Sequence, residues 1–150
     1  MTYLRKRKQQ NLNTAFTANT ASQQVSTTVL DVTNSEVTFT PPSGNFTHVV
    51  YEYTLQYDFS PSSSTNVFLE LREKIGNGAY TQLGDGYRVN EVAQTQKYQS
   101  TLTGRFLIPI YSGARSYKLT IRAKLTTRQI TLHQTTSGDV YSPIIQVYCV

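Results

Sequence analysis

Apolar and polar residues alternate along much of the chain, and this alternation predicts a series of β-strands. The longest example is Val49–Phe59, in which the odd positions are apolar or aromatic and the even positions are mostly polar. Because successive side chains of a strand point to opposite faces of a sheet, one face of this strand is predicted to be buried and the other solvated. The same period recurs in Asn66–Ile75 and Ser116–Leu125.

Shorter runs of the same kind fill most of the remaining chain, and no window shows a helical period. The turn signals Gly76-Asn77-Gly78 and Gly84-Asp85-Gly86 separate neighbouring runs. Roughly eight to ten strands at such spacings are typical of an all-β antiparallel sandwich. The further predicted strands are Thr27–Val32, Glu36–Thr40, Ala79–Leu83, Tyr87–Val92, Lys97–Tyr111, Ile130–Gln134 and Ile144–Val150.

The apolar phase of the clearest strands predicts the core between the two sheets. Gly104 interrupts the strand Lys97–Tyr111, where a bulge or a close backbone approach is expected. Eight side chains are predicted to point between the sheets: Tyr53, Leu55, Leu69, Leu71, Phe106, Ile108, Leu119 and Ile121.

The last strand, Ile144–Val150, is apolar on both faces. Such a strand must lie centrally in its sheet or be covered by another subunit. We therefore expect it near a subunit contact, with Ile145, Val147 and Cys149 as the contacting residues.

The first residues of the chain lack any apolar period, which predicts an extended arm over residues 1–24 and a folded body over residues 25–150. The arm carries four consecutive cations, Arg5–Lys8, which are attracted to an acidic surface or a polyanion. Its predicted partner-binding residues are Tyr3, Leu4, Arg5, Lys6, Arg7, Lys8, Leu12 and Phe16.

Charge is distributed unevenly along the chain, which has a net charge of +5. Residues 1–30 carry four cations and no acid, residues 31–91 are mainly acidic, and residues 92–150 are mainly basic. A chain divided in this way can meet copies of itself through complementary faces. The alternative is that both halves are solvated exteriors of one sandwich.

Residues that would support catalysis or metal binding are sparse. The chain has 2 His and 1 Cys, and neither His48 nor His133 has a carboxylate or cysteine at metal-ligand spacing. Glu70 and Glu73 fall on opposite faces of their strand, so they form no acid–base pair. No apolar run is long enough to cross a membrane. We expect no enzyme activity, cofactor, small-molecule substrate or membrane partner.

Two segments resemble a known architecture, the TNF/C1q-like jelly roll. One is Val67–Lys74 leading into a Gly-Asn-Gly turn, and the other is the strand Thr103–Ile110 followed by Gly113–Leu119. The resemblance covers about residues 27–150. It implies a jelly-roll body of the kind found in small virion proteins of tailed bacteriophages, as capsid decoration (cement) proteins or fibre heads, commonly as homotrimers.

Three functions follow from these features. The first is a structural virion protein that decorates or cements a phage capsid, bound through its arm to the major capsid protein or another virion protein. The second is a receptor- or carbohydrate-binding head of a tail or fibre, for which the 11 Tyr offer stacking surfaces. The third, nucleic-acid binding through the basic arm, ranks last because aromatics are not interleaved with the basic residues. The first role predicts a protein made in the host cytoplasm and located on the virion.

Overall fold

The computed structural model describes residues 13–15, 23–60, 65–92, 98–124, 129–133 and 144–150, and all regular elements in them are β-strands paired antiparallel. No helix long and apolar enough to cross a membrane occurs in this part of the chain. The strands are β1 (Asn13–Ala15), β2 (Gln23–Val25), β3 (Leu30–Asp31), β4 (Val37–Phe39), β5 (His48–Ser60), β6 (Thr65–Ile75), β7 (Thr81–Val92), β8 (Tyr98–Pro109), β9 (Arg115–Ala123), β10 (Gln129–His133) and β11 (Ile144–Cys149).

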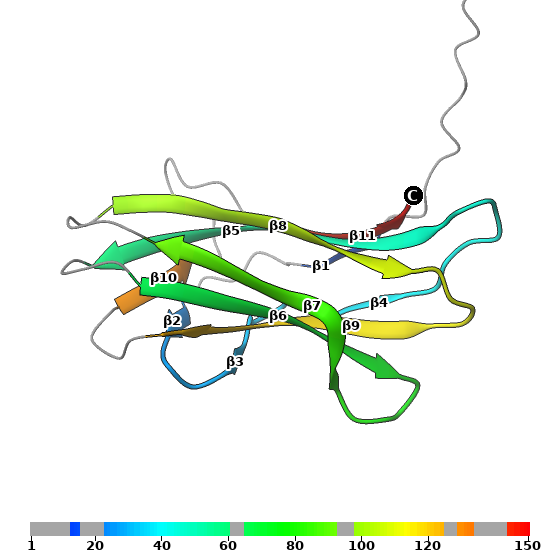
Figure 1. The fold of residues 1–150 in the computed structure, drawn as a ribbon, viewed down its shortest axis with the longest axis horizontal. Helices are drawn as coiled ribbons and strands as arrows, with labels where there is room; N and C mark the ends of the chain where they lie inside the picture. Colours follow the sequence, from blue (N-terminus) through cyan, green and yellow to red (C-terminus); the bar gives the residue numbers. More distant parts are fainter. Residues whose placement is uncertain (1–12, 16–22, 61–64, 93–97, 125–128, 134–143) are drawn as a thin grey trace, which may run out of the picture.

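The strands form two sheets that face each other across one core, as in a β-sandwich (Figure 1). Sheet A is organised around the long strand β5. β8 pairs with one side of β5, while β11 and then β10 follow each other along the opposite side. β1 extends the sheet beyond β11, and β2 extends it beyond β10.

Sheet B has the order β3-β9-β6-β7, with β4 also pairing with β9. The turn Gly76-Asn77-Gly78 joins β6 to β7 as predicted, and Gly76 has a φ of 55°, a value that glycine adopts without strain. The expectation for Gly84-Asp85-Gly86 was wrong, because these residues form no turn between two strands and lie inside β7.

The glycines of β7 mark an irregularity in the ladder. Glu70 is paired with Tyr87 and Arg72 with Gln82, so a step of two residues on β6 matches a step of five on β7. The three extra residues on β7 form a large bulge, one of the features that glycine inside a strand indicates. Two predicted strands are therefore one.

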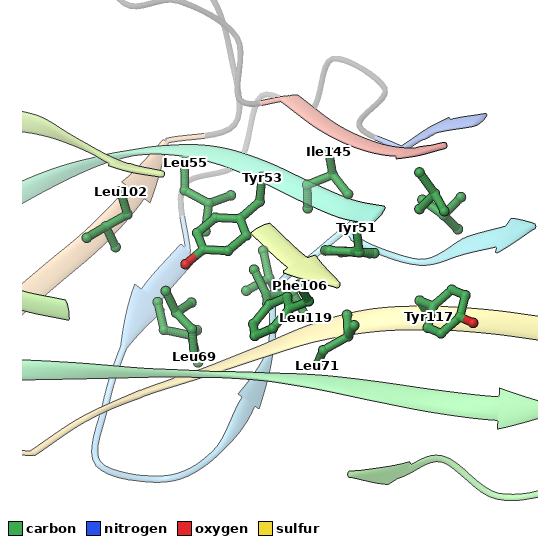
Figure 2. Packing of buried hydrophobic residues seen from close by; sticks show 14 of the residues in the cluster. Tyr51, Tyr53, Leu55, Leu69, Leu71, Leu102, Phe106, Tyr117, Leu119 and Ile145 are labelled. Atoms are coloured by element: carbon green, nitrogen blue, oxygen red, sulfur yellow. The ribbon is translucent and has the colours of Figure 1, made fainter. Parts of the chain in front are cut away.

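All eight residues predicted to form the core are buried, each with 2% exposure or less. Figure 2 shows Tyr51 and Tyr53 of sheet A opposite Leu69 and Leu71 of sheet B. Burial of one such side chain stabilises the fold by about 1.5–3 kcal/mol. The period of two placed the inward face of β5, β6, β8 and β9 correctly.

The predicted boundary between arm and body needs correction. Asn13–Ala15 pairs with β11 and Gln23–Val25 pairs with β10, so both segments belong to sheet A. An edge strand is held through backbone N–H and C=O groups, which require no apolar period in its sequence. The absence of such a period therefore did not exclude strands between residues 13 and 25.

Candidate protein–protein interface

Three ion pairs join charged side chains on the outer face of sheet B. Lys118 Nζ lies 2.7 Å from Asp31 Oδ2, Lys74 Nζ lies 3.4 Å from Glu36 Oε1, and Arg72 contacts Glu70. The ring of Tyr80 lies between the two lysines, 4.8 Å from Lys74 Nζ and 4.4 Å from Lys118 Nζ. Exposed ion pairs contribute only about 0–1 kcal/mol each to stability. Because these charges already have partners within the chain, this part of the outer face is polar.

A further ion pair closes one end of the core. Arg115 Nη1 lies 3.2 and 3.1 Å from the two carboxylate oxygens of Glu73, and its guanidinium carbon lies 4.0 Å from the centre of the Tyr111 ring. The Glu73 side chain is only 10% exposed. Each oxygen of this nearly buried carboxylate therefore accepts a hydrogen bond from the same guanidinium, as in a structural ion pair. No three His, Cys, Asp or Glu side chains of the described residues are grouped as metal ligands.

The outer face of sheet A differs because it carries apolar side chains. Pairing across β11, β5 and β8 aligns Tyr148, Val50 and Leu107 in one row. In the next row Val150 and His48 exchange two backbone hydrogen bonds of 3.0 and 3.2 Å, and His48 is opposite Pro109. Directly opposed residues share a face. We call Val50, Leu107, Pro109, Tyr148 and Val150 the apolar band.

The apolar band is accessible at its margins. Leu107 is 50% exposed and Val150 is 45% exposed. Val50 points outward but is only 1% exposed, so it supports the band from beneath and offers no surface to a second chain. Ile110, which follows β8 directly, is 41% exposed. Contiguous exposed apolar side chains are typical of protein–protein or membrane interaction sites and of ligand-binding grooves.

A polar row borders the apolar band. Gln146, Glu52 and Arg105 are aligned across the same three strands. Glu52 Oε2 accepts hydrogen bonds from Gln146 Nε2 at 2.7 Å and from the Tyr148 hydroxyl at 3.0 Å. Burial, and then the bond to Glu52, raise the pKa of Tyr148. The carboxylate is therefore held in place by donors of a neighbouring strand.

The structure corrects the predicted oligomer contact. β11 does lie inside its sheet, between β1 and β5. However, Ile145, Val147 and Cys149 point into the sandwich and are 0% exposed within a single chain, so a second chain cannot touch them. Burial also raises the pKa of the Cys149 thiol. The outward side chains of this strand are those of Ile144, Gln146 and Tyr148.

The predicted arm residues lie outside the described residues: Tyr3, Leu4, Arg5, Lys6, Arg7, Lys8, Leu12 and Phe16. Sequence reasoning also missed the apolar band, because its members are distant in the chain and meet only through the strand register. The sequence contained one local indication of the band. Val50 is the apolar exception among the even, mostly polar positions of β5.

No family model matches the chain, and no curated protein matches it either.

Proposed function

We propose that the chain is a non-enzymatic structural protein that acts by binding other protein chains, and that it decorates or cements the capsid of a tailed phage. The observation that carries the first part is the apolar band on the outer face of sheet A. Its side chains come from three neighbouring strands of a rigid sheet. A rigid apolar surface loses little conformational freedom on binding, which favours stable association.

The preferred partner at the apolar band is the chain itself, and the proposed assembly is a homotrimer with a jelly-roll body. Both features are implied by the resemblance of Val67–Lys74 and Thr103–Ile110 to TNF/C1q-like domains. The distribution of apolar side chains supports self-association, because the band occupies one outer face while the outer face of sheet B carries paired charges.

We assign attachment to the larger particle to residues 1–12, the part of the predicted arm that precedes β1. Asn13, the first residue of β1, is paired with Val147 near the end of β11. Residues 1–12 therefore join sheet A at the end that carries the apolar band. An oligomer would carry several arms, and linked binding sites gain affinity through a raised effective concentration.

The alternative, a receptor- or carbohydrate-binding head, receives less support. It relied on tyrosines as stacking surfaces, and Tyr51, Tyr53, Tyr57 and Tyr117 are all buried in the core. A ring in the core cannot stack on a sugar.

Light scattering after size exclusion tests the self-association. We expect a trimer for the natural chain and a folded monomer for Leu107→Lys, since a buried unpaired charge strongly opposes association. Ile75→Lys is the matched control, because Ile75 is 62% exposed at the end of β6 in sheet B. A monomeric natural chain at tens of micromolar would contradict this part.

Co-sedimentation with tailed-phage particles tests the virion role. The protein should pellet with the particles at a fixed number of copies per capsid. Absence of the protein from purified particles would contradict decoration and leave the self-association result standing.

A further inference from the structure

Glu52 and Arg105 lie opposite each other on β5 and β8 but form no ion pair. Glu52 instead accepts hydrogen bonds from Gln146 and Tyr148 on β11, the strand on its other side. Arg105 is exposed, and among the residues that the structure describes no side chain forms an ion pair with its guanidinium. The polar row thus presents an oriented carboxylate and, one strand away, an unpaired cation.

This arrangement contrasts with the rest of the described molecule. All four ion pairs found among the described residues involve β6, β9 or the segments next to β3 and β4, so they belong to sheet B. Among the side chains that the structure describes, sheet A shows no ion pair. Its Glu52 and Arg105 border the apolar band.

The physical chemistry of association explains why Glu52 and Arg105 would be unpaired in a single chain. When an apolar surface is covered, a charge at its margin is desolvated and must find a partner. A carboxylate can accept about four hydrogen bonds, and a guanidinium offers five N–H donors in a planar fork. Glu52 accepts two, so it retains capacity for the fork of an arginine.

We propose that Arg105 of one copy pairs with Glu52 of the partner subunit when the outer faces of sheet A associate. The proposal rests on self-association through the apolar band. It commits to a second copy of this chain because the face carries both members of the pair, so that each copy supplies what the other requires. The apolar band supplies the burial, and the charge pair sets the register and excludes other partners.

The test is a charge swap read by oligomeric state. Glu52→Arg and Arg105→Glu each place like charges at the contact and should weaken association by roughly 10- to 100-fold. The double variant Glu52→Arg/Arg105→Glu restores opposite charges in every symmetric arrangement and should recover the natural size. Lys124→Glu, a charge reversal at an exposed residue after β9, is the control and should leave the size unchanged.

Each variant is measured by sedimentation velocity, with circular dichroism to confirm that the chain remains folded. Dissociation of both single variants together with recovery in the double variant supports the pair. Single variants that keep the natural size overturn the pair while self-association stands. Failure of the double variant to recover also overturns it.

Two other outcomes would also contradict the proposed pair. A natural chain that is already monomeric overturns both this pair and self-association. If Arg105→Glu keeps the natural size while deletion of residues 1–12 abolishes assembly, association depends on residues 1–12, and the proposed pair is wrong.

Discussion

The ring of Tyr53 covers Gly104 across the β5–β8 ladder. The two residues are directly opposed, and a Cβ added at Gly104 would lie 2.7 Å from Cζ and 2.9 Å from Cε1 of the tyrosine. The pairing continues without a register shift on both sides, so the glycine provides a close approach and no bulge. The position requires glycine because the space of a side chain is already filled by the neighbouring ring.

The first prediction is that Gly104→Ala destabilises the protein by about 1–3 kcal/mol, because the buried ring of Tyr53 must move to admit the methyl group. Urea unfolding measures the change. Gly84→Ala is the matched control in another strand, since no atom lies within 4 Å of a Cβ added there. Equal stability of the two variants would contradict the close packing of Tyr53 on Gly104.

The second prediction concerns the core of sheet B. Leu119 is 0% exposed, and Leu119→Ala should destabilise the protein by about 2–5 kcal/mol, because it leaves a cavity in addition to the lost burial. Ile75→Ala is the control at a 62% exposed position and should change stability by less than about 0.5 kcal/mol. A loss below half a kilocalorie for Leu119→Ala would mean that the strand phase is wrong.

The period of two predicted these core positions because burial of alternate side chains is a local property of a strand. Gly84 shows the limit of this reasoning. Its glycine-aspartate-glycine context is equally compatible with a turn and with a bulge, and pairing with β6 decides for the bulge.

The candidate interface was harder to predict from the sequence, because it too depends on how the strands pair. Val50, Leu107 and Tyr148 are far apart along the chain, and only the register of three strands aligns them. The final strand is apolar on both faces because one face packs in the core and the other belongs to the outer surface of sheet A. Val147 packs in the core, and Tyr148 lies on the outer face.

The third prediction is alkaline destabilisation. Burial raises the pKa of Tyr51, whose hydroxyl donates to the carbonyl oxygen of Ser35 at 2.9 Å, and burial likewise raises the pKa of Tyr117. Unfolded tyrosine titrates near pH 10, so above that pH the unfolded state loses protons that the folded state retains. Stability is therefore fully present below about pH 10 and is lost as the pH rises.

The slope of unfolding free energy against pH measures this effect. Each retained proton should lower stability by up to about 1.4 kcal/mol per pH unit above pH 10. Tyr51→Phe should reduce the slope by one such contribution, whatever its effect on stability at neutral pH. A flat profile between about pH 10 and 11 would show that these hydroxyls ionise as readily in the folded protein as in the unfolded chain.

The fourth prediction separates the arm from the two edge strands. Deletion of residues 1–12 should leave the stability of the body nearly unchanged, because every described strand remains. Deletion of residues 1–25 also removes β1 and β2, which pair with β11 and β10, and exposes two further strand edges to solvent. This longer deletion should lower the urea midpoint and promote aggregation. Equal midpoints for the two truncated chains would contradict the placement of β1 and β2 in sheet A.

The last prediction is that residues 1–12 supply most of the attachment to the particle. The adjacent cations Arg5–Lys8 would speed encounter with an acidic surface, and apolar residues such as Tyr3 and Leu4 would then hold it, at about 1.5–3 kcal/mol for each one fully buried. The deletion of residues 1–12 should yield a folded oligomer that no longer co-sediments with particles. Replacing Arg5–Lys8 with glutamine should weaken attachment most at low salt, because salt screens exposed charges. Lys124→Gln controls for a general loss of positive charge. Decoration at natural occupancy by the truncated chain would assign attachment to the sandwich.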